Sequence, residues 1–453
     1  MTIDARDEGG VTSLTPETIA VAVLAIVGLA VRAVLVVSSP GTIDVEVWEG
    51  HAREIDRLGL VAYYRGGEFI FNHPPLAGWA IAALHRVAEQ GGPAFPSLLR
   101  APFVLIDAAT AWGVVQLAGL ATRPRLRAHR YLLGALYWVS PLAIVFSAQH
   151  GNTDSAVACS LVWAVVAFAR RRPAWAGVAL GLGMWIKIPG LLAAPALFIA
   201  LPDLRARVRF AAALGATAVV GFAPALLVDA RAFVEAVFFY SGLRIQTTTG
   251  VLIWGPQIFY PDPASLSLPV RRAFVAFAQG YYRLDGAIVS GLVVVYAWLR
   301  RRHRAPDALA ATLAQSYALI FAFTNFFAWQ YLAWSLPLWL FGGWPLALVA
   351  HGLCAAYVWG LYAWLCEHWL LLDTWRFLAK PDWPGPVLFL RSASVAFLMG
   401  LGVTRLGQAV REEWSTWRGD AEGGGAERGG AESSSAEGGG SEPGSEGGVR
   451  PGA

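Results

Sequence analysis

The sequence carries little charge for its length. Only 15% of its 453 residues are Asp, Glu, Lys or Arg, against about a quarter in an average soluble protein, whereas 56% are hydrophobic. These proportions exclude an ordinary water-soluble enzyme. Lysine is almost missing, because it occurs only as Lys187 and Lys380, and the net charge of +4 comes from short arginine clusters between apolar runs. We therefore expect no nucleic-acid surface.

Cysteine is scarce as well. The three cysteines, Cys159, Cys354 and Cys366, lie in apolar segments and lack the spacing of a zinc site or a disulfide framework. We interpret them as small buried hydrophobic side chains. The sequence therefore indicates neither a bound metal nor another cofactor.

Long apolar runs and aromatic residues dominate the chain instead. A helix of about 20 residues crosses a bilayer, and apolar runs of that size recur, the first from Thr18 to Val37. This run has no basic segment before it and no small-residue cleavage site after it, so we expect a retained helix rather than a signal peptide. The 20 tryptophans and 13 tyrosines suit the two membrane–water interfaces. The predicted fold class is an all-α polytopic membrane protein.

The apolar runs predict twelve crossings, with eleven as the alternative. After the span at 18–37, single spans are expected at 98–120, 131–148, 153–169, 208–228, 285–300, 308–325, 329–349, 352–371 and 386–404. Arginines flank the stretch 174–201 at both ends, and the positive-inside rule places both clusters in the cytoplasm. This stretch then crosses twice, as two short helices broken at Lys187-Ile188-Pro189-Gly190, where proline removes a backbone donor and glycine allows a turn.

The same rule orients the chain and divides it. The basic loops put the N-terminus inside, so two long connections, 39–97 and 229–284, lie on the outer face. Residues 1–404 then form the transmembrane domain. Residues 405–453 are expected to be a disordered cytoplasmic tail, because from Gly419 onward Gly, Ser and Glu leave little apolar surface to bury.

Acidic side chains are concentrated in the first outer loop. Seven of the 31 acidic residues fall there: Asp44, Glu46, Glu49, Glu54, Asp56, Glu68 and Glu89. A helix that begins at Asp44 would carry Trp48, Ala52 and Ile55 in one apolar stripe and lie along the membrane surface. Asp44 and Glu46 diverge on such a helix, and we favour Asp44 as the one that points into a cavity. The alternative is that Asp44 is the N-cap of a helix in a solvated loop.

Four segments carry recognisable motifs in order along the chain. They are Gly41 to Trp48 with Phe71-Asn72-His73-Pro74-Pro75-Leu76, Gln149 to Asp154, Gly181 to Lys187, and Gln330 to Pro337. Together they resemble the GT-C superfamily of membrane glycosyltransferases, in particular the branch of dolichyl-phosphate-glucose glucosyltransferases and bacterial polytopic mannosyltransferases. His73 stands where that branch has a tyrosine, and a single Asp-x-Glu replaces the Asp-x-Asp of some relatives.

The resemblance implies a fold and an activity. The fold is a GT-C-like bundle whose large first outer loop carries amphipathic surface helices. The activity is transfer of a hexose, mannose or glucose, from a polyprenyl phosphate to a hydroxyl of a lipid-linked glycan, a polysaccharide or a protein. The implied place is the periplasmic face of a bacterial inner membrane, or the lumenal face in a eukaryote. Asp44 is then the catalytic base, and Gln330 belongs to the substrate-binding residues.

The chemistry itself needs one carboxylate and one or two cations. The donor's anomeric carbon already carries a phosphate leaving group, so the enzyme has to deprotonate the acceptor hydroxyl and stabilise the departing charge. A carboxylate with a pKa of about 4 is ionised at neutral pH and can act as the base. Asp44 fits that role with inversion of the anomeric centre, and Glu46 is the second catalytic candidate. The candidates for the phosphate are His73, His150, Lys187 and Arg244.

Several of these residues also have a structural interpretation. Lys187 would snorkel to the interface from a broken helix, and His150 would bond a neighbouring backbone turn. Asp154 caps its helix or binds an acceptor hydroxyl. Asp107, in the span 98–120, is expected to pair with polar groups of neighbouring helices.

Two other functions compete with the enzyme. Transporters usually have paired broken helices in their two halves, whereas this chain has one obvious break, at 187–190, and an acidic first loop that transport does not require. A non-catalytic scaffold of glycan assembly is the third hypothesis, and no single residue excludes it.

Overall fold

The computed structural model describes residues 15–66, 71–239, 254–325, 328–375 and 383–431. This part of the chain is helical and contains no strand, which confirms the all-α class. By length and composition, six of its helices could cross a membrane, and a bent pair makes a seventh. The six are α1 (Pro16–Ser38), α5 (Phe95–Gly119), α12 (Leu204–Phe238), α13 (Leu268–Leu299), α16 (Trp344–Leu365) and α17 (Gly385–Ala431).

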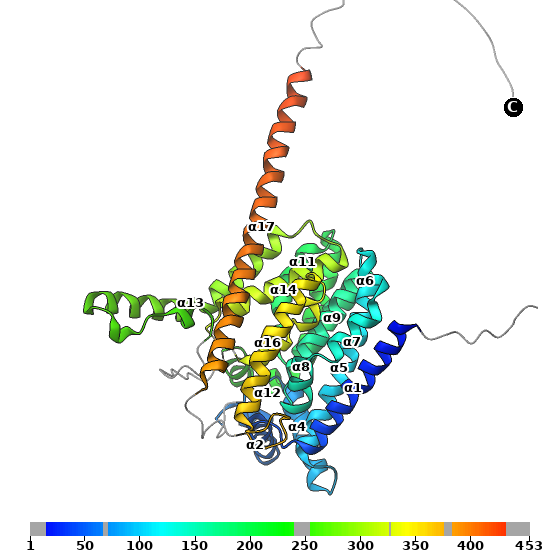
Figure 1. Ribbon diagram of the computed structural model, residues 1–453, viewed down its shortest axis with the longest axis vertical. Helices are drawn as coiled ribbons and strands as arrows, with labels where there is room; N and C mark the ends of the chain where they lie inside the picture. Colours follow the sequence, from blue (N-terminus) through cyan, green and yellow to red (C-terminus); the bar gives the residue numbers. More distant parts are fainter. Residues whose placement is uncertain (1–14, 67–70, 240–253, 326–327, 376–382, 432–453) are drawn as a thin grey trace, which may run out of the picture. The chain divides into compact units, whose positions relative to one another are not determined.

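The centre of the first unit, Met1–Arg405, is built on α5. This helix packs against α7 (Arg130–Trp138) and α9 (Asp154–Ala169) (Figure 1). Helix α9 is apolar on all sides and mostly buried, as is expected of a helix enclosed by others. The bent pair consists of α7 followed by α8 (Pro141–Ile144) and η1 (Val145–Gln149), and the chain turns by 48° between its two halves.

A buried ion pair ties three of these helices together. Arg32 Nη2 on α1 lies 2.9 Å from Asp107 Oδ2 on α5, and both side chains are 1% exposed. The hydroxyl of Tyr137 on α7 donates to the other oxygen of Asp107 at 2.9 Å. The expected helix–helix role of Asp107 is confirmed.

The stretch 174–201 is broken where the sequence predicts. Helix α10 (Pro173–Met184) ends before Lys187, whose backbone is extended, and η2 (Ile188–Ala193) and α11 (Ala194–Ala200) follow. Pro189 in the first turn of η2 has no N–H to continue the helix of α10. The break leaves the Lys187 side chain at a bend between two short helices.

The expected spans at 329–349 and 352–371 are wrong. In their place are two short helices, η5 (Trp329–Ala333) and α15 (Leu336–Trp339), and then α16. Gly343 has a φ of 115°, a conformation that favours glycine, and Pro345 then starts α16. The apolar run 329–371 therefore yields one long helix, not two.

Two other expected spans correspond to helices that are not among the membrane-spanning candidates. The spans predicted at 153–169 and 308–325 correspond to α9, with 16 residues, and α14 (Pro306–Phe323), with 18, whereas a crossing needs about 20. Both are mostly buried. The long helices in the described residues are therefore fewer than the eleven or twelve expected crossings.

The first outer loop carries the expected helices, and they lie on both sides of Pro74-Pro75. Helices α2 (Ile43–Leu58) and α3 (Leu60–Tyr64) precede the two prolines, and α4 (Pro75–Glu89) starts with the second. Helix α2 packs against α4. The predicted apolar stripe of α2 is confirmed, because its three members are buried in the small core between these helices: Trp48, Ala52 and Ile55.

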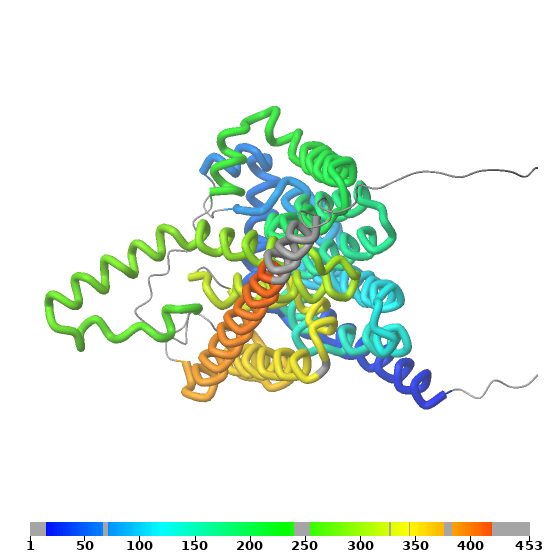
Figure 2. The backbone as a smooth tube through the Cα atoms, turned by 90° about the horizontal axis from the view of Figure 1, so that it is seen from above, coloured from blue at the N-terminus to red at the C-terminus, as the bar shows by residue number. Residues whose placement is uncertain are grey.

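The second outer loop is more helical than expected. Helix α12 continues past a kink at Asp229 to Phe238, and α13 begins at Leu268, well before the predicted 285. Arg65 Nε binds Asp229 Oδ2 at 2.6 Å and so ties this kink to α3. Both views show the first half of α13 projecting from the bundle (Figures 1 and 2). Arg244 lies outside the described residues.

The first part of the predicted tail is helical. Helix α17 runs through the domain boundary expected at 404 and continues to Ala431, so residues 405–431 are helical rather than disordered. Residues 405–418 are rich in Arg, Glu, Gln, Leu and Ala, all good helix formers. Residues 432–453 lie outside the described residues. The chain separates into two units at this place, Met1–Arg405 and Leu406–Ala453.

Candidate active site

Asp44 lies in the first turn of α2 but does not cap it. The N-cap is Thr42, whose Oγ1 accepts a hydrogen bond from the Asp44 N–H at 3.3 Å. The N-cap interpretation of Asp44 is therefore wrong, and its carboxylate is free for other partners. Gly41 allows the chain to enter α2 here, because its φ is +89° and a Cβ would lie 2.6 Å from Val45.

The carboxylate of Asp44 is bound by the segment that follows η1. His150 Nε2 lies 2.8 Å from Asp44 Oδ2, and Asn152 Nδ2 donates to the same oxygen at 3.2 Å. The π-helical turn of η1 directly precedes His150, and such turns are frequent at functional sites. Gly151 has a φ of +67°, and a Cβ there would meet Arg100 at 2.7 Å. Two motifs that are distant in sequence thus meet at one carboxylate.

Arg100 fixes the backbone on both sides of this meeting point. Its buried guanidinium donates to the carbonyls of Leu35 and Ser39 at the end of α1, at 3.2 and 2.7 Å, and to that of Ala148 in η1 at 3.4 Å. Most carbonyls at a helix end have no partner within the helix, although that of Leu35 also accepts from the Ser39 N–H. Arg100 supplies further donors there and joins the entry to α2 to the entry to His150.

The surroundings of Asp44 favour its ionised form. Burial raises the pKa of Asp44, but His150, through its hydrogen bond and its charge when protonated, and then Lys187 lower that pKa below its ordinary value of 3.8. The side chain is nevertheless 35% exposed. Asp44 is therefore an anion that a substrate hydroxyl can reach, as a general base has to be.

Glu46 points elsewhere. It is exposed, two residues along α2, and the predicted divergence of the two carboxylates is confirmed. Of the two catalytic candidates, only Asp44 meets the His150 segment.

A second charged pair lies nearby. Lys187 Nζ donates to Asp154 Oδ1 at 2.8 Å, and these side chains are 13% and 0% exposed. Trp334 Nε1 donates to the same carboxylate oxygen. The ammonium also lies 5.2 Å from the ring of Tyr331, which stacks on Trp334 with centroids 4.2 Å apart. Lys187 is thus held in an inward ion pair, and the snorkelling interpretation is wrong.

Two acceptor atoms near these charges have no hydrogen-bond partner among the described residues. Asp154 Oδ2 and Gln330 Oε1 are both buried and unpaired. A buried polar atom without a partner is costly, so each can accept a hydrogen bond from a bound hydroxyl.

His73 does not supply a cation. Its ring lies 4.5 Å from that of Trp48, and its Nδ1 is buried without a partner. Burial, with smaller contributions from Lys187 and His51, lowers the pKa of His73 well below its ordinary value. A neutral imidazole cannot balance the charge of a phosphate.

Several residues around Asp44 and Lys187 were not identified from the sequence. Asn152, Tyr331 and Trp334 lie inside the motif segments Gln149 to Asp154 and Gln330 to Pro337, but the motifs do not indicate the roles of these three side chains. Tyr362, which bonds His150 Nδ1 at 2.6 Å, lies in an apolar run with no local mark. No group of three His, Cys, Asp or Glu side chains that could hold a metal occurs in the described ranges.

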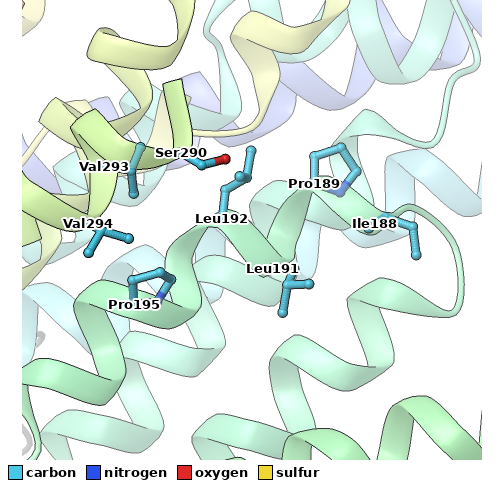
Figure 3. Close-up of a pocket in the computed structure, with 8 residues that line it drawn as sticks. All are labelled: Ile188, Pro189, Leu191, Leu192, Pro195, Ser290, Val293 and Val294. Atoms are coloured by element: carbon cyan, nitrogen blue, oxygen red, sulfur yellow. The ribbon is translucent and has the colours of Figure 1, made fainter. Parts of the chain in front are cut away.

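The segment that follows Lys187 in the chain lines an apolar pocket of about 330 Å³ (Figure 3). It lies between the segment after Lys187 and the second half of α13. Every lining side chain but that of Ser290 is a hydrocarbon: Ile188, Pro189, Leu191, Leu192, Pro195, Val293 and Val294. The first of them directly follows Lys187 in the chain.

Comparison of the sequence with protein families gives one match. The sequence model of glycosyltransferase family 87 matches residues 71–324, which is more than half of the chain. The matched region contains His150, Asp154 and Lys187. No curated protein matches the chain. The chain thus belongs to glycosyltransferase family 87, a GT-C-like family of polytopic membrane enzymes.

Proposed function

We propose that this glycosyltransferase moves a hexose, mannose or glucose, from a polyprenyl phosphate to an acceptor hydroxyl, with Asp44 as the general base. The observation that carries the proposal is the accessible Asp44 carboxylate, bonded through one oxygen to His150 and Asn152. Membership of a glycosyltransferase family favours the enzyme over the transporter and the scaffold.

The reaction is a single displacement. Asp44 takes the proton of the acceptor hydroxyl while the hydroxyl oxygen bonds to the anomeric carbon. The bond from that carbon to the phosphate oxygen breaks, and its electron pair leaves with the polyprenyl phosphate. Attack opposite the leaving group inverts the anomeric centre.

Lys187 is the main candidate for the donor phosphate. An ammonium has three N–H donors, and the pair with Asp154 uses one of them. The pair also holds the ammonium in place, and a prearranged cation stabilises a leaving anion better than a mobile one. His150 and Arg244 remain further candidates, whereas the neutral His73 cannot balance the charge of the phosphate.

Two buried oxygen atoms without hydrogen-bond partners among the described residues can bind hydroxyl groups of the sugar or of the molecule that receives it. Asp154 Oδ2 and Gln330 Oε1 would each accept a hydrogen bond from a hydroxyl group. Asp154 would then position both Lys187 and a substrate hydroxyl.

The apolar pocket supports a lipid carrier. An isoprenoid chain gains about 25 cal/mol per Å² of apolar surface that it buries, and the pocket begins one residue after Lys187 (Figure 3). A phosphate at Lys187 with its prenyl chain along Ile188 and Leu192 would match this arrangement.

The charge distribution supports a site on the outer, periplasmic side of a cell membrane. Helices α9 and α10 pack together as a hairpin, whose turn carries Arg170, Arg171 and Arg172. Asp154 and Lys187 lie at its opposite end. Because arginines favour the cytoplasmic side, the site is on the other face.

The experiment is a donor panel. The purified protein is incubated with radiolabelled polyprenyl-phosphate mannose, polyprenyl-phosphate glucose or the matching nucleotide sugars, together with a membrane-lipid extract as acceptor. We expect label to leave one polyprenyl-phosphate donor and to appear in a new product. Consumption of a nucleotide sugar with no use of either lipid donor would contradict the proposal.

A further inference from the structure

A chain of hydrogen bonds leads away from Asp44 into the bundle. Beyond His150, whose Nε2 faces Asp44, the hydroxyl of Tyr362 lies 2.6 Å from His150 Nδ1. Trp329 Nε1 in turn donates to the Tyr362 oxygen at 2.9 Å. These four residues come from α2, the segment after η1, α16 and η5.

We infer that Tyr362 is a positioning residue, which fixes the tautomer of His150 so that its Nε2–H donates to Asp44. The inference rests on the proposed role of Asp44 as the base. Tyr362 itself touches neither Asp44 nor a substrate in this account.

The direction of each hydrogen bond follows from Trp329, the last residue of this series. An indole N–H can only donate, so the Tyr362 oxygen is the acceptor of the bond from Trp329. The Tyr362 hydroxyl then has its own proton available for His150 Nδ1. A neutral imidazole carries one hydrogen, and with Nδ1 as acceptor that hydrogen is on Nε2.

This tautomer matters for the carboxylate. Asp44 Oδ2 then receives two donors, from His150 and Asn152, and Oδ1 is left for the acceptor's proton. With the hydrogen on Nδ1, the lone pair of Nε2 could accept from Asn152 Nδ2 at 3.2 Å, but it would face the anionic Oδ2 at the shorter distance of 2.8 Å. A histidine in the wrong tautomer is a severe defect in catalytic sites built on such chains.

The packing around Tyr362 allows its hydroxyl to be removed without loss of its ring contacts. Tyr362 is fully buried, and its ring lies 5.0 Å from that of Trp375 and 6.4 Å from those of Phe146 and Trp329. Tyr362→Phe keeps these ring contacts and removes only the hydroxyl. Tyr357→Phe is the matched control, since Tyr357 is buried on the same helix but is not bonded to His150.

The first measurement reads the tautomer directly. The protein is labelled with ¹⁵N-histidine and studied by NMR in lipid bilayers, with His150→Gln used to identify the His150 signals among the eight histidines. We expect a bare Nδ1 and a protonated Nε2 in the parent, and a change of this pattern in Tyr362→Phe. A parent protein with Nδ1 protonated, or the same pattern in both proteins, would overturn the inference.

The second measurement is kinetic. In Tyr362→Phe we expect kcat to fall by about 10- to 100-fold, the usual effect of losing an orienting partner, with an unchanged KM for the donor. Tyr357→Phe should keep the parental kcat. A parental kcat in Tyr362→Phe, or an equal loss in both variants, would overturn the inference.

Asp44→Asn separates this inference from the proposed function. If Asp44→Asn keeps parental transfer, the base assignment fails and the inference fails with it. If Asp44→Asn loses transfer while Tyr362→Phe keeps both the tautomer and the rate, only the role of Tyr362 is refuted.

Discussion

Three aspartates in one bundle show how surroundings decide what a carboxylate does. Asp107 is fully enclosed with Arg32 and holds helices together. Asp154 is equally buried but paired with Lys187, which directly precedes the segment that lines an apolar pocket. Asp44 alone combines a hydrogen-bonded oxygen with an exposed fraction of 35%. Exposure and partners, not residue type, distinguish the proposed base from the two buried carboxylates.

The charge of Lys187 can be tested apart from its structural role. Lys187→Met leaves the Asp154 charge buried without its counter-ion, which typically costs 3–5 kcal/mol, so both the unfolding temperature and transfer should fall. In the double variant Lys187→Met/Asp154→Asn the buried charge is gone, and we expect the unfolding temperature to recover. Transfer should stay low because the phosphate has lost its cation. Recovery of transfer in the double variant would show that Lys187 has only a structural role.

The acidity of Asp44 gives a prediction on pH. A base must be ionised, so transfer falls as pH drops through the pKa of Asp44, which lies below 3.8. Between pH 5 and 8 protonation of Asp44 should not limit the parent. His150→Ala removes the hydrogen bond that helps to lower this pKa, so the acid limb of kcat should move toward neutral pH. An acid limb at the parental pH in His150→Ala would contradict the assignment.

At the scale of elements, the sequence predicted what local chemistry determines. The break after Lys187 is set by Pro189 and Gly190, and the start of α4 by Pro74-Pro75, so both were found. In the run 329–371, the first expected span was wrong. Hydropathy alone cannot distinguish a single membrane-spanning helix at 329–349 from two short helices that are followed by a turn at Gly342-Gly343.

The candidate site was predictable only in part, for a related reason. Asp44, His150 and Lys187 could be chosen one by one, since a charged or titratable residue beside a membrane span is unusual. That Asp44 and His150 touch depends on packing between elements 106 residues apart. Tyr362 was not found at all, because a tyrosine in an apolar run has no local signature of a catalytic neighbour.

The Arg32–Asp107 pair makes a prediction about the bundle. Asp107→Leu leaves the Arg32 guanidinium buried without its counter-ion, and the expected loss of stability is about 3–5 kcal/mol. Arg32→Met/Asp107→Leu replaces both charges by apolar groups and should recover most of it. Thermal unfolding of the purified variants checks this. A single variant as stable as the parent would show that the pair does not hold α1 to α5.

At the scale of the whole molecule, topology decides which side of the membrane the chemistry occupies. Arg53 on α2 and Arg125 in the basic segment after α5 are both exposed. The positive-inside rule places them on opposite sides of the membrane. In intact cells, an impermeant maleimide should label Arg53→Cys and not Arg125→Cys, which should react only after permeabilisation. The reverse pattern would put the site in the cytoplasm.

The assignment of Asp44 as the base depends on the molecule at all three scales. It needs the Asp44 carboxylate itself, the hydrogen bonds of Arg100 to the neighbouring backbone, and a bundle that brings His150 to Asp44. Its most direct test is the turnover of Asp44→Asn, which keeps the size and most hydrogen bonds of the side chain but cannot accept the proton. We predict that kcat falls by roughly 10²–10⁴-fold, the usual effect of losing a positioned base, while Glu46→Gln costs much less. Transfer by Asp44→Asn at close to the parental rate, or an equal loss in Glu46→Gln, would contradict the account.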